Sequence, residues 1–383
     1  MRTLYLHIGH SKTGSSFLQA SFANSIQALA DHGFDYPGAP NEAAAGWKIS
    51  SGNGQALLLA PPESFEIDRD KVFFSAERLF RSFAQEKEWE QRLIAFCSHH
   101  DVGAVEVLMF LRDPIPHAES SYQQMVKRGG ATESVDKTFE NYVQPELVRA
   151  ALTRQYGDLP IRWHVYNYDR HKTELIELTE SFLGLPEGTL VRGDDRPVNR
   201  SMTAGELNIL RGLNGHDPVA ASLLADALCN DVPEVKSETV FPTHAVQKAM
   251  LARLAEAIAD VDGMIDPAEH YGVALQNPGC EADRYTFSAR QVEVLTQTLG
   301  RRVGEVTRQM QVERARRQIN LAQAMIEKGR LSDAGAMAER AEAALKGLGG
   351  EGDIEGLRRV ARRMRAAATK ADSPPKKPPA KPD

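Results

Sequence analysis

The sequence contains little cysteine. Its three cysteines, Cys97, Cys229 and Cys280, are far apart in a chain of 383 residues. Their spacing fits no metal site, and an odd number excludes a complete disulfide framework. We therefore expect buried or free thiols in a protein of a reducing compartment.

Long apolar segments are also lacking. No run approaches the roughly 18 apolar residues that a membrane-spanning helix needs. The N-terminal residues MRTLYLHIGHSK contain no apolar core of the length found in signal peptides. The sequence therefore predicts a cytoplasmic protein, and leaves peripheral association with a membrane open.

An excess of positive charge is missing from the chain as a whole. It has 46 Lys+Arg against 52 Asp+Glu, a net charge of −6, which argues against general nucleic-acid binding. The charge is uneven, because residues 301–383 contain 19 basic and 11 acidic residues while the remainder has a net charge of −14. We expect the basic segment to meet an acidic partner, a membrane surface or the protein's own acidic body.

The first half of the chain alternates between strand-like and helix-like segments. The segments rich in β-forming residues are 2–8, 71–77, 105–113 and 161–169. Apolar residues at helical spacing follow the first of them, as with Leu18, Phe22 and Leu29. The alternation predicts an α/β fold, a parallel β-sheet with helices on both faces.

The most informative segment is HIGHSKTGSS, residues 7–16, between the first strand and the first helix. Free N–H groups at the start of a helix form an anion site, aided by the helix dipole. Gly9 and Gly14 allow the backbone to come close to a ligand, and Lys12 adds a positive charge. Hydroxyl donors follow on Thr13, Ser15 and Ser16. The alternative is a solvated lysine beside a serine that only caps the helix.

This loop differs from the common nucleotide-binding motifs. GxxxxGK[ST] is absent, because Lys12 precedes Gly14 instead of following it. No GxGxxG follows a strand either, so dinucleotide binding has no support. Ordinary hydrolysis of ATP or GTP is disfavoured.

The segment HIGHSKTGSSFLQ resembles the 5′-phosphosulfate loop of sulfotransferases, which is a strand, then Pro-Lys-Thr/Ser-Gly-Thr-Thr, then a helix. This chain has Ser11 where the family commonly has proline, and Ser15 and Ser16 where it has two threonines. The hydroxyl groups are kept. The resemblance implies that the residues from Gly9 to Ser16 bind 3′-phosphoadenosine 5′-phosphosulfate.

A second segment, LRDPIPHAESSYQQMVKRGG, supports the same resemblance. Sulfotransferases bind the 3′-phosphate of the cofactor with an arginine at a strand end and a serine eight residues later, and Arg112 and Ser120 have that spacing. An arginine offers a planar fork of donors to a phosphate. The alternative is a surface Arg–Asp pair and a serine at a helix start.

Two weaker segments extend the resemblance to roughly residues 1–215. Tyr168 stands where the family has a tyrosine that contacts adenine; Tyr166 competes for this role, and core packing is the alternative for both. The segment RPVNRSMTAGE resembles one of bacterial members, in which Asn199 and Arg200 would close over the nucleotide.

The resemblance implies transfer of a sulfuryl group to an acceptor hydroxyl, or an amine, without a metal. The acceptor is a saccharide or a glycolipid by analogy alone. Lys12 would stabilise the charge that develops on the transferred group and on the leaving oxygen. Two functions from other classes stay open, a non-catalytic nucleotide-binding or scaffold protein with this fold and a P-loop-like kinase.

Glu77, just after the second predicted strand, is the candidate general base. A solvated charge that pairs with Arg78 or Arg81 is the equal alternative. His10 lies inside the phosphate loop and is a candidate for assisting the leaving group. His7, His10 and His117 are the rivals of Glu77 for the role of general base.

The expected organisation has four parts. The first is a sulfotransferase-like core, residues 1–215, and the second is a helical and loop part, residues 216–300, that completes the acceptor side. A basic helical hairpin follows over residues 301–370 and resembles a single tetratricopeptide-type unit. The proline-lysine tail, residues 371–383, is expected to be disordered.

Overall fold

The computed structural model describes residues 1–38, 52–193, 200–279, 285–349 and 353–371. The chain forms two compact units, Met1–Ser288 and Ala289–Asp383. The boundary expected near residue 300 falls inside a helix of the second unit.

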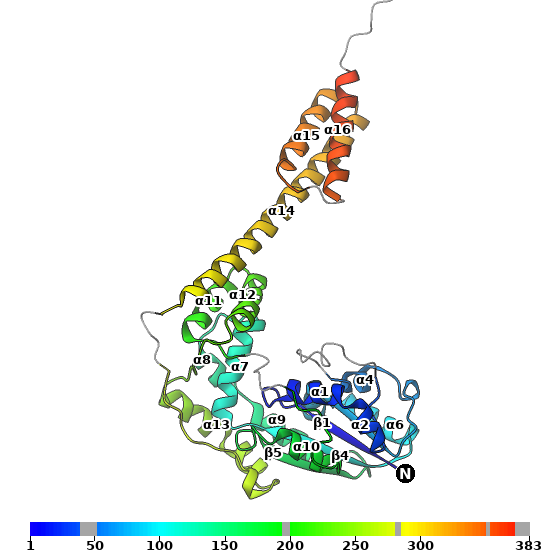
Figure 1. The fold of residues 1–383 in the computed structure, drawn as a ribbon, viewed down its shortest axis with the longest axis vertical. Helices are drawn as coiled ribbons and strands as arrows, with labels where there is room; N and C mark the ends of the chain where they lie inside the picture. The colour runs from blue at the N-terminus through cyan, green and yellow to red at the C-terminus, as the bar shows by residue number, and fades with distance from the viewer. Residues whose placement is uncertain (39–51, 194–199, 280–284, 350–352, 372–383) are drawn as a thin grey trace, which may run out of the picture. The chain divides into compact units, whose positions relative to one another are not determined.

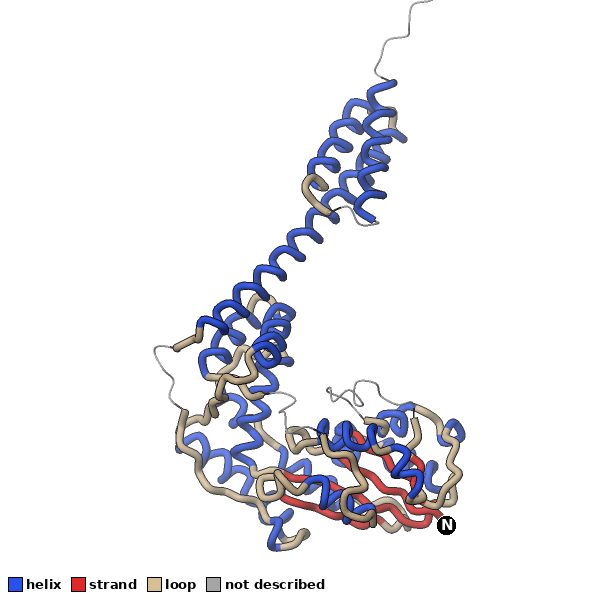
Figure 2. The backbone as a smooth tube through the Cα atoms, in the orientation of Figure 1, coloured by secondary structure: helices blue, strands red, loops and turns tan. Residues whose placement is uncertain are grey.

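The first unit is built on a five-stranded sheet, red in Figure 2. Its strands are β1 (Arg2–Ile8), β2 (Phe34–Asp35), β3 (Lys71–Ala76), β4 (Val102–Leu111) and β5 (Ile161–Asn167). They are ordered β2-β3-β1-β4-β5, and every neighbouring pair is parallel. The predicted α/β fold and parallel sheet are therefore confirmed. The sequence did not predict β2, because two residues are too few to show an alternating pattern.

Helices cover both faces of this sheet (Figure 1). Leu4, Leu6 and Ile8 of β1 face one core, whose helices are α5 (Glu77–Gln85), α6 (Glu88–His99), α9 (Gln144–Thr153) and α13 (His244–Asp262). Phe73 and Phe110 face the other core, whose helices are α1 (Ser15–Asn24), α2 (Ile26–Asp31) and α10 (Leu175–Leu183). Strand side chains alternate between the faces, so one strand serves both cores.

The remaining helices of the first unit pack against β3 or against one another. They are α4 (Gly54–Leu59), α7 (Pro114–Arg128), α8 (Val135–Glu140), α11 (Ala204–Asn214) and α12 (Pro218–Asp231), with short 3₁₀ turns at Pro62–Ser64 and Pro267–Glu269. Helix α7 packs against α8, α11 and α12. It therefore links the sheet edge to the helices beyond residue 200.

The second unit is made of α14 (Ala289–Glu327), α15 (Leu331–Ala344) and α16 (Asp353–Ala371). Small and branched side chains such as Ala315, Ile319 and Ala361 form its core. The sequence predicted a hairpin of two helices and missed α16, which is rich in both arginine and alanine and buries few large apolar side chains. None of the described helices is both long and apolar enough to span a bilayer.

Candidate active site

A cavity of about 630 Å³ opens where the strands of the first unit end. The lining residues that follow β1, β3, β4 and β5 are Lys12, Glu77, Arg112 and Tyr168. The carboxyl ends of parallel strands lie at one edge of the sheet, so these residues converge although the sequence separates them widely.

The loop between β1 and α1 forms one wall of the cavity. Lys12 has φ 63° and Gly14, the residue before α1, has φ 80°. A left-handed conformation is costly for lysine, and such strain gathers at functional sites. No side chain caps the first turn of α1, where Ser15 and Ser16 line the cavity. The N–H groups of that turn and the helix dipole favour an anion there.

Gly14→Ala is expected to destabilise the protein by about 2–4 kcal/mol, because a left-handed alanine costs about 1–2 kcal/mol and forced overlap about as much again. A Cβ at Gly14 would lie 2.6 Å from Cδ1 of Leu175. Gly33→Ala is the matched control, since Gly33 has φ 83° but nothing within 4 Å of a Cβ. Urea unfolding measures the free energy of unfolding of both variants. Equal losses of stability in the two variants would contradict the steric argument.

At Gly9, which we predicted to let a ligand approach the backbone, a side chain would clash with the protein itself. A Cβ on Gly9 would lie 2.5 Å from Oγ of Ser15 and 2.9 Å from Cγ of Glu77. Because glycine has no side chain, Glu77 and the start of α1 can pack closely at the end of β1.

Lys12 carries a perturbed ammonium group. Burial lowers the pKa of Lys12 to about 8, helped by the positive charges of Lys127 and Arg112 and opposed by the carboxylate of Glu77. Nζ of Lys12 donates a hydrogen bond to Oε1 of Gln124 on α7, at 3.3 Å. The lysine is thus held inside the cavity and is still mainly protonated at neutral pH.

Glu77 is the first residue of α5 and follows β3 directly. Desolvation raises the pKa of its carboxyl group, while Lys12 and the hydroxyl of Ser15 oppose the rise. The neighbouring charge is therefore Lys12, and Arg81 instead donates a hydrogen bond to Gln85. Glu77 is itself exposed where it lines the cavity, so the base interpretation and the solvated one both stay open.

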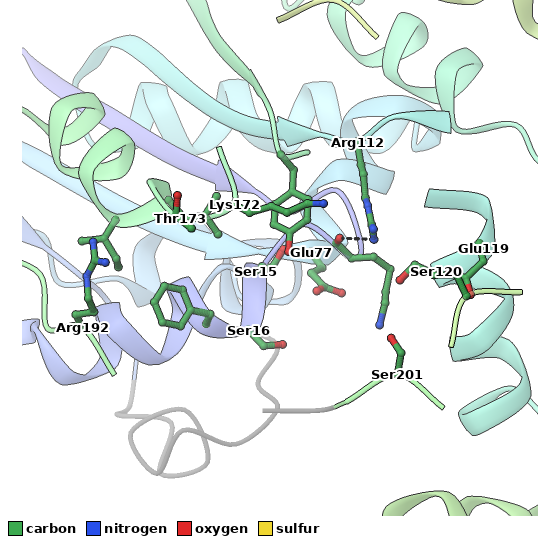
Figure 3. Close-up of a pocket in the computed structure, with 17 residues that line it drawn as sticks. Ser15, Ser16, Glu77, Arg112, Glu119, Ser120, Lys172, Thr173, Arg192 and Ser201 are labelled. Carbon is green, nitrogen blue, oxygen red and sulfur yellow. Dashed lines mark hydrogen bonds between the residues drawn. The ribbon is translucent and has the colours of Figure 1, made fainter. Parts of the chain in front are cut away.

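Arg112 and Ser120 both line the cavity, from the end of β4 and from α7. Figure 3 shows them on the same side of the space into which Glu77 also points. The guanidinium of Arg112 donates to the carbonyl of Lys12 at 3.3 Å, the dashed line, and pairs with Asp169 at 3.4 Å. These contacts fix the arginine at the cavity and leave part of its donor fork for a ligand.

Tyr168 lies in the cavity wall, whereas Tyr166 does not. The guanidinium of Arg112 is 5.4 Å from the ring centroid of Tyr168. Tyr166 packs against Phe110 at 5.9 Å between ring centroids. Of the two tyrosines that the sequence proposed, only Tyr168 is placed to stack on a ligand.

His10 is fully buried and lies outside the residues that line the cavity. Its ring is 4.3 Å from that of His117 and 5.1 Å from that of Phe80. Burial, with Arg112 nearby, lowers the pKa of His10 to about 3. A protonated imidazole that assists a leaving group, as we predicted, does not fit this position.

The other loop side chains hold the loop itself. The hydroxyl of Thr13 donates to the carbonyl of His10, so it is not directed to a ligand. Nε2 of His117 donates to the carbonyl of Ser11 at 2.8 Å, and Nδ1 accepts from the hydroxyl of Tyr142 at 2.8 Å. His117 therefore ties α7, which carries Ser120, to the loop. His7 is also buried and contacts Ser75.

Arg200 does not reach the cavity, contrary to the sequence prediction. Its guanidinium makes two hydrogen bonds to Glu206, of 2.6 and 2.8 Å, and others to backbone carbonyls such as that of Val232. A fully paired, buried arginine has no donor left for a nucleotide. Asn199, predicted to act with it, lies outside the described residues, as does Cys280.

Several cavity residues were missed by the sequence argument. Glu119 lies beside Ser120 on α7 and accepts hydrogen bonds from Gln123 and Val240. The others that contribute polar groups are Lys172, Thr173, Arg192, Ser201 and Thr239. Lys172 and Thr173 follow Tyr168 closely and could have been inferred from that neighbourhood. Ser201 belongs to the segment RPVNRSMTAGE, from which we had named Asn199 and Arg200 instead. Nothing in the local sequence marks Thr239, which reaches the cavity through tertiary packing.

The described part of the chain contains no group of three or more His, Cys, Asp or Glu side chains arranged to hold a metal ion. Comparison of the chain with protein-family models, curated proteins and solved structures finds no match.

Proposed function

We propose that this protein transfers a sulfuryl group from 3′-phosphoadenosine 5′-phosphosulfate to a hydroxyl group, or an amine, of an acceptor. The observation that carries the proposal is the single cavity that gathers Lys12, the start of α1, Arg112, Ser120 and Tyr168. Two separate sets of donor groups, at the start of α1 and at Arg112 with Ser120, line this cavity together with the aromatic ring of Tyr168. A nucleotide with phosphate at both its 3′ and its 5′ positions needs such a set of groups.

Each group has a task set by its chemistry. The N–H groups of the first turn of α1 and the hydroxyls of Ser15 and Ser16 would bind the 5′ side of the donor. Arg112 and Ser120 would bind the 3′-phosphate, and Tyr168 would offer a face to the base. The ammonium of Lys12 would stabilise negative charge as the bond to the sulfuryl group breaks.

Glu77 fits the role of the base that takes the acceptor proton. Its raised pKa brings the carboxylate closer to the range in which a general base works well. Both it and Lys12 line the same cavity. An acceptor oxygen next to Glu77 would therefore attack a group whose developing charge Lys12 stabilises.

A thermal-shift experiment tests the donor. Adenosine 3′,5′-bisphosphate is expected to raise Tm, because a ligand that binds only the folded state stabilises it. ATP with Mg²⁺ is expected to give no comparable shift. A shift with ATP–Mg²⁺ alone would support a kinase, and no shift with either nucleotide would support a non-catalytic scaffold.

A transfer screen with radiolabelled donor against saccharides and glycolipids then identifies the acceptor class.

Arg112→Ala is expected to weaken binding of adenosine 3′,5′-bisphosphate by about 10–100-fold, because a charged hydrogen-bond donor contributes about 1.5–3 kcal/mol. Binding of adenosine 5′-phosphate should change little, since it has no 3′-phosphate. Calorimetry measures both affinities. Arg112→Lys is the control, because it keeps the positive charge but lacks the planar donor group of the guanidinium. Equal losses of affinity for the two nucleotides in Arg112→Ala would show that Arg112 does not bind the 3′-phosphate.

A further inference from the structure

The second unit presents a basic surface on α16, red in Figure 1. Its members are Arg358, Arg359, Arg362, Arg363 and Arg365. At about 100° per residue these arginines share an arc of about 160° of the helix surface. The apolar residues of α16 that pack into the core of the unit lie outside this arc and begin beside Arg365; they are Ile354, Leu357, Ala361 and Met364. One side of α16 thus holds the unit together and the other carries positive charge.

Part of this arc is already used inside the unit. Arg358 donates to the backbone carbonyls of Leu345 and Leu348 just after α15. Arg365 pairs with Glu342 at 3.1 Å. The exposed arginines of the arc for which the described residues supply no ion-pair partner are Arg359, Arg362 and Arg363. These three are available to an external anion.

A hollow of about 520 Å³ lies between α15 and α16, beside the arc. The charged groups that line it are Lys346, Arg358, Arg362 and Arg365, against Glu339 and Glu342. Cations outnumber carboxylates in this hollow, so the basic arc continues into it. A ligand with several negative charges could contact both.

The composition of the unit narrows the kind of ligand. Residues 289–371 contain no Phe, Trp or Tyr. Single-stranded nucleic acid binds largely by stacking on such rings, and amphipathic membrane helices insert an apolar face. The apolar face of α16 is buried instead. The exposed side of α16 carries a row of guanidinium groups. Two N–H donors of one guanidinium can bind two oxygens of a single sulfate, phosphate or carboxylate group.

We propose that this surface, the α16 arginine surface, binds a sulfate-bearing polysaccharide. The choice of sulfate rests on the proposed function and on a saccharide as its acceptor, because an enzyme that sulfates a saccharide makes a product of this chemistry. Repeated sulfate groups along a glycan complement a row of arginines along a helix. The acidic first unit, by contrast, has little general attraction for such a polymer.

The experiment measures binding of the full chain to dextran sulfate and to unsulfated dextran at increasing salt. Arg359→Glu/Arg363→Glu is expected to weaken dextran sulfate binding by about tenfold or more, since two exposed ion pairs become repulsions. Arg314→Glu/Arg317→Glu on α14 is the matched control. This control changes the net charge by the same amount at two exposed arginines. It should bind dextran sulfate nearly as tightly as the wild type does.

Equal weakening by the two double variants, or no weakening by the α16 variant, would overturn the proposal. Binding of unsulfated dextran would also overturn the proposal. So would binding of duplex DNA or of phosphatidylglycerol vesicles as tightly as dextran sulfate. The thermal shift with adenosine 3′,5′-bisphosphate is measured on the same variants. It should persist in both, so a failed donor site and a failed glycan surface give different results.

Discussion

Lys12→Ala is expected to lower kcat for sulfuryl transfer by about 10³-fold or more while the protein stays folded. A preorganised donor aimed at developing charge typically accounts for about 10²–10³ in rate, and Lys12 adds a full positive charge inside a cavity. The N–H groups of α1 remain, so affinity for adenosine 3′,5′-bisphosphate should fall much less. A radiolabelled transfer assay and calorimetry measure the two effects separately.

The backbone at Lys12 makes this variant easy to interpret. Alanine at φ 63° bears the same strain as lysine does, so the free energy of unfolding should change little. Lys137→Ala is the control, because Lys137 is exposed and pairs with Glu140 on α8, away from the cavity residues. Full activity in Lys12→Ala would refute the proposed function.

The parts of the site that follow from sequence are those encoded locally. The loop between β1 and α1 is contiguous, and the spacing of Arg112 and Ser120 is set by one strand end and one helix. Such short segments carry their own geometry, so the pattern predicts which segments reach the cavity, although not which way each side chain points. Tyr168 is a similar case, because it directly follows a strand of the sheet.

The parts that could not be predicted depend on contacts between distant segments. Arg200 looked available in the sequence, but Glu206 and the carbonyl of Val232 take up its donors. His10 stands inside the loop, yet Phe80 and His117 enclose it. A local pattern can place a residue near a strand end, but only packing decides which way its side chain points.

The charge of the chain also gains meaning from the structure. The acidic body would repel a polyanionic donor on average, so attraction must be local. If the proposed function holds, the cavity would supply this attraction through Lys12, Arg112 and Lys172, together with the start of α1. The basic excess of the sequence lies elsewhere, on exposed arginines of the second unit. The proposed donor site and the proposed polymer-binding surface therefore consist of different residues.

Glu77→Gln is expected to lower kcat by about 10²–10⁴-fold, the usual contribution of a general base. The amide has nearly the same shape as the carboxylate, so affinity for adenosine 3′,5′-bisphosphate should be almost unchanged. Single-turnover assays measure the rate, and calorimetry measures the affinity. An unchanged rate would give the base role to another group.

The pH profile makes the test of Glu77 sharper. The wild type needs Glu77 deprotonated, so its rate should fall as pH drops through a carboxyl pKa that lies above the usual 4.5. It also needs Lys12 protonated, so its rate should fall as pH rises through about 8, well below the usual lysine value of 10.5. In Glu77→Gln the fall in rate at low pH should vanish, while the fall at high pH remains.

Lys12→Arg should move the fall at high pH to a still higher pH, because a guanidinium stays charged above pH 12. A fall in rate at low pH that survives in Glu77→Gln would show that a different group takes the proton.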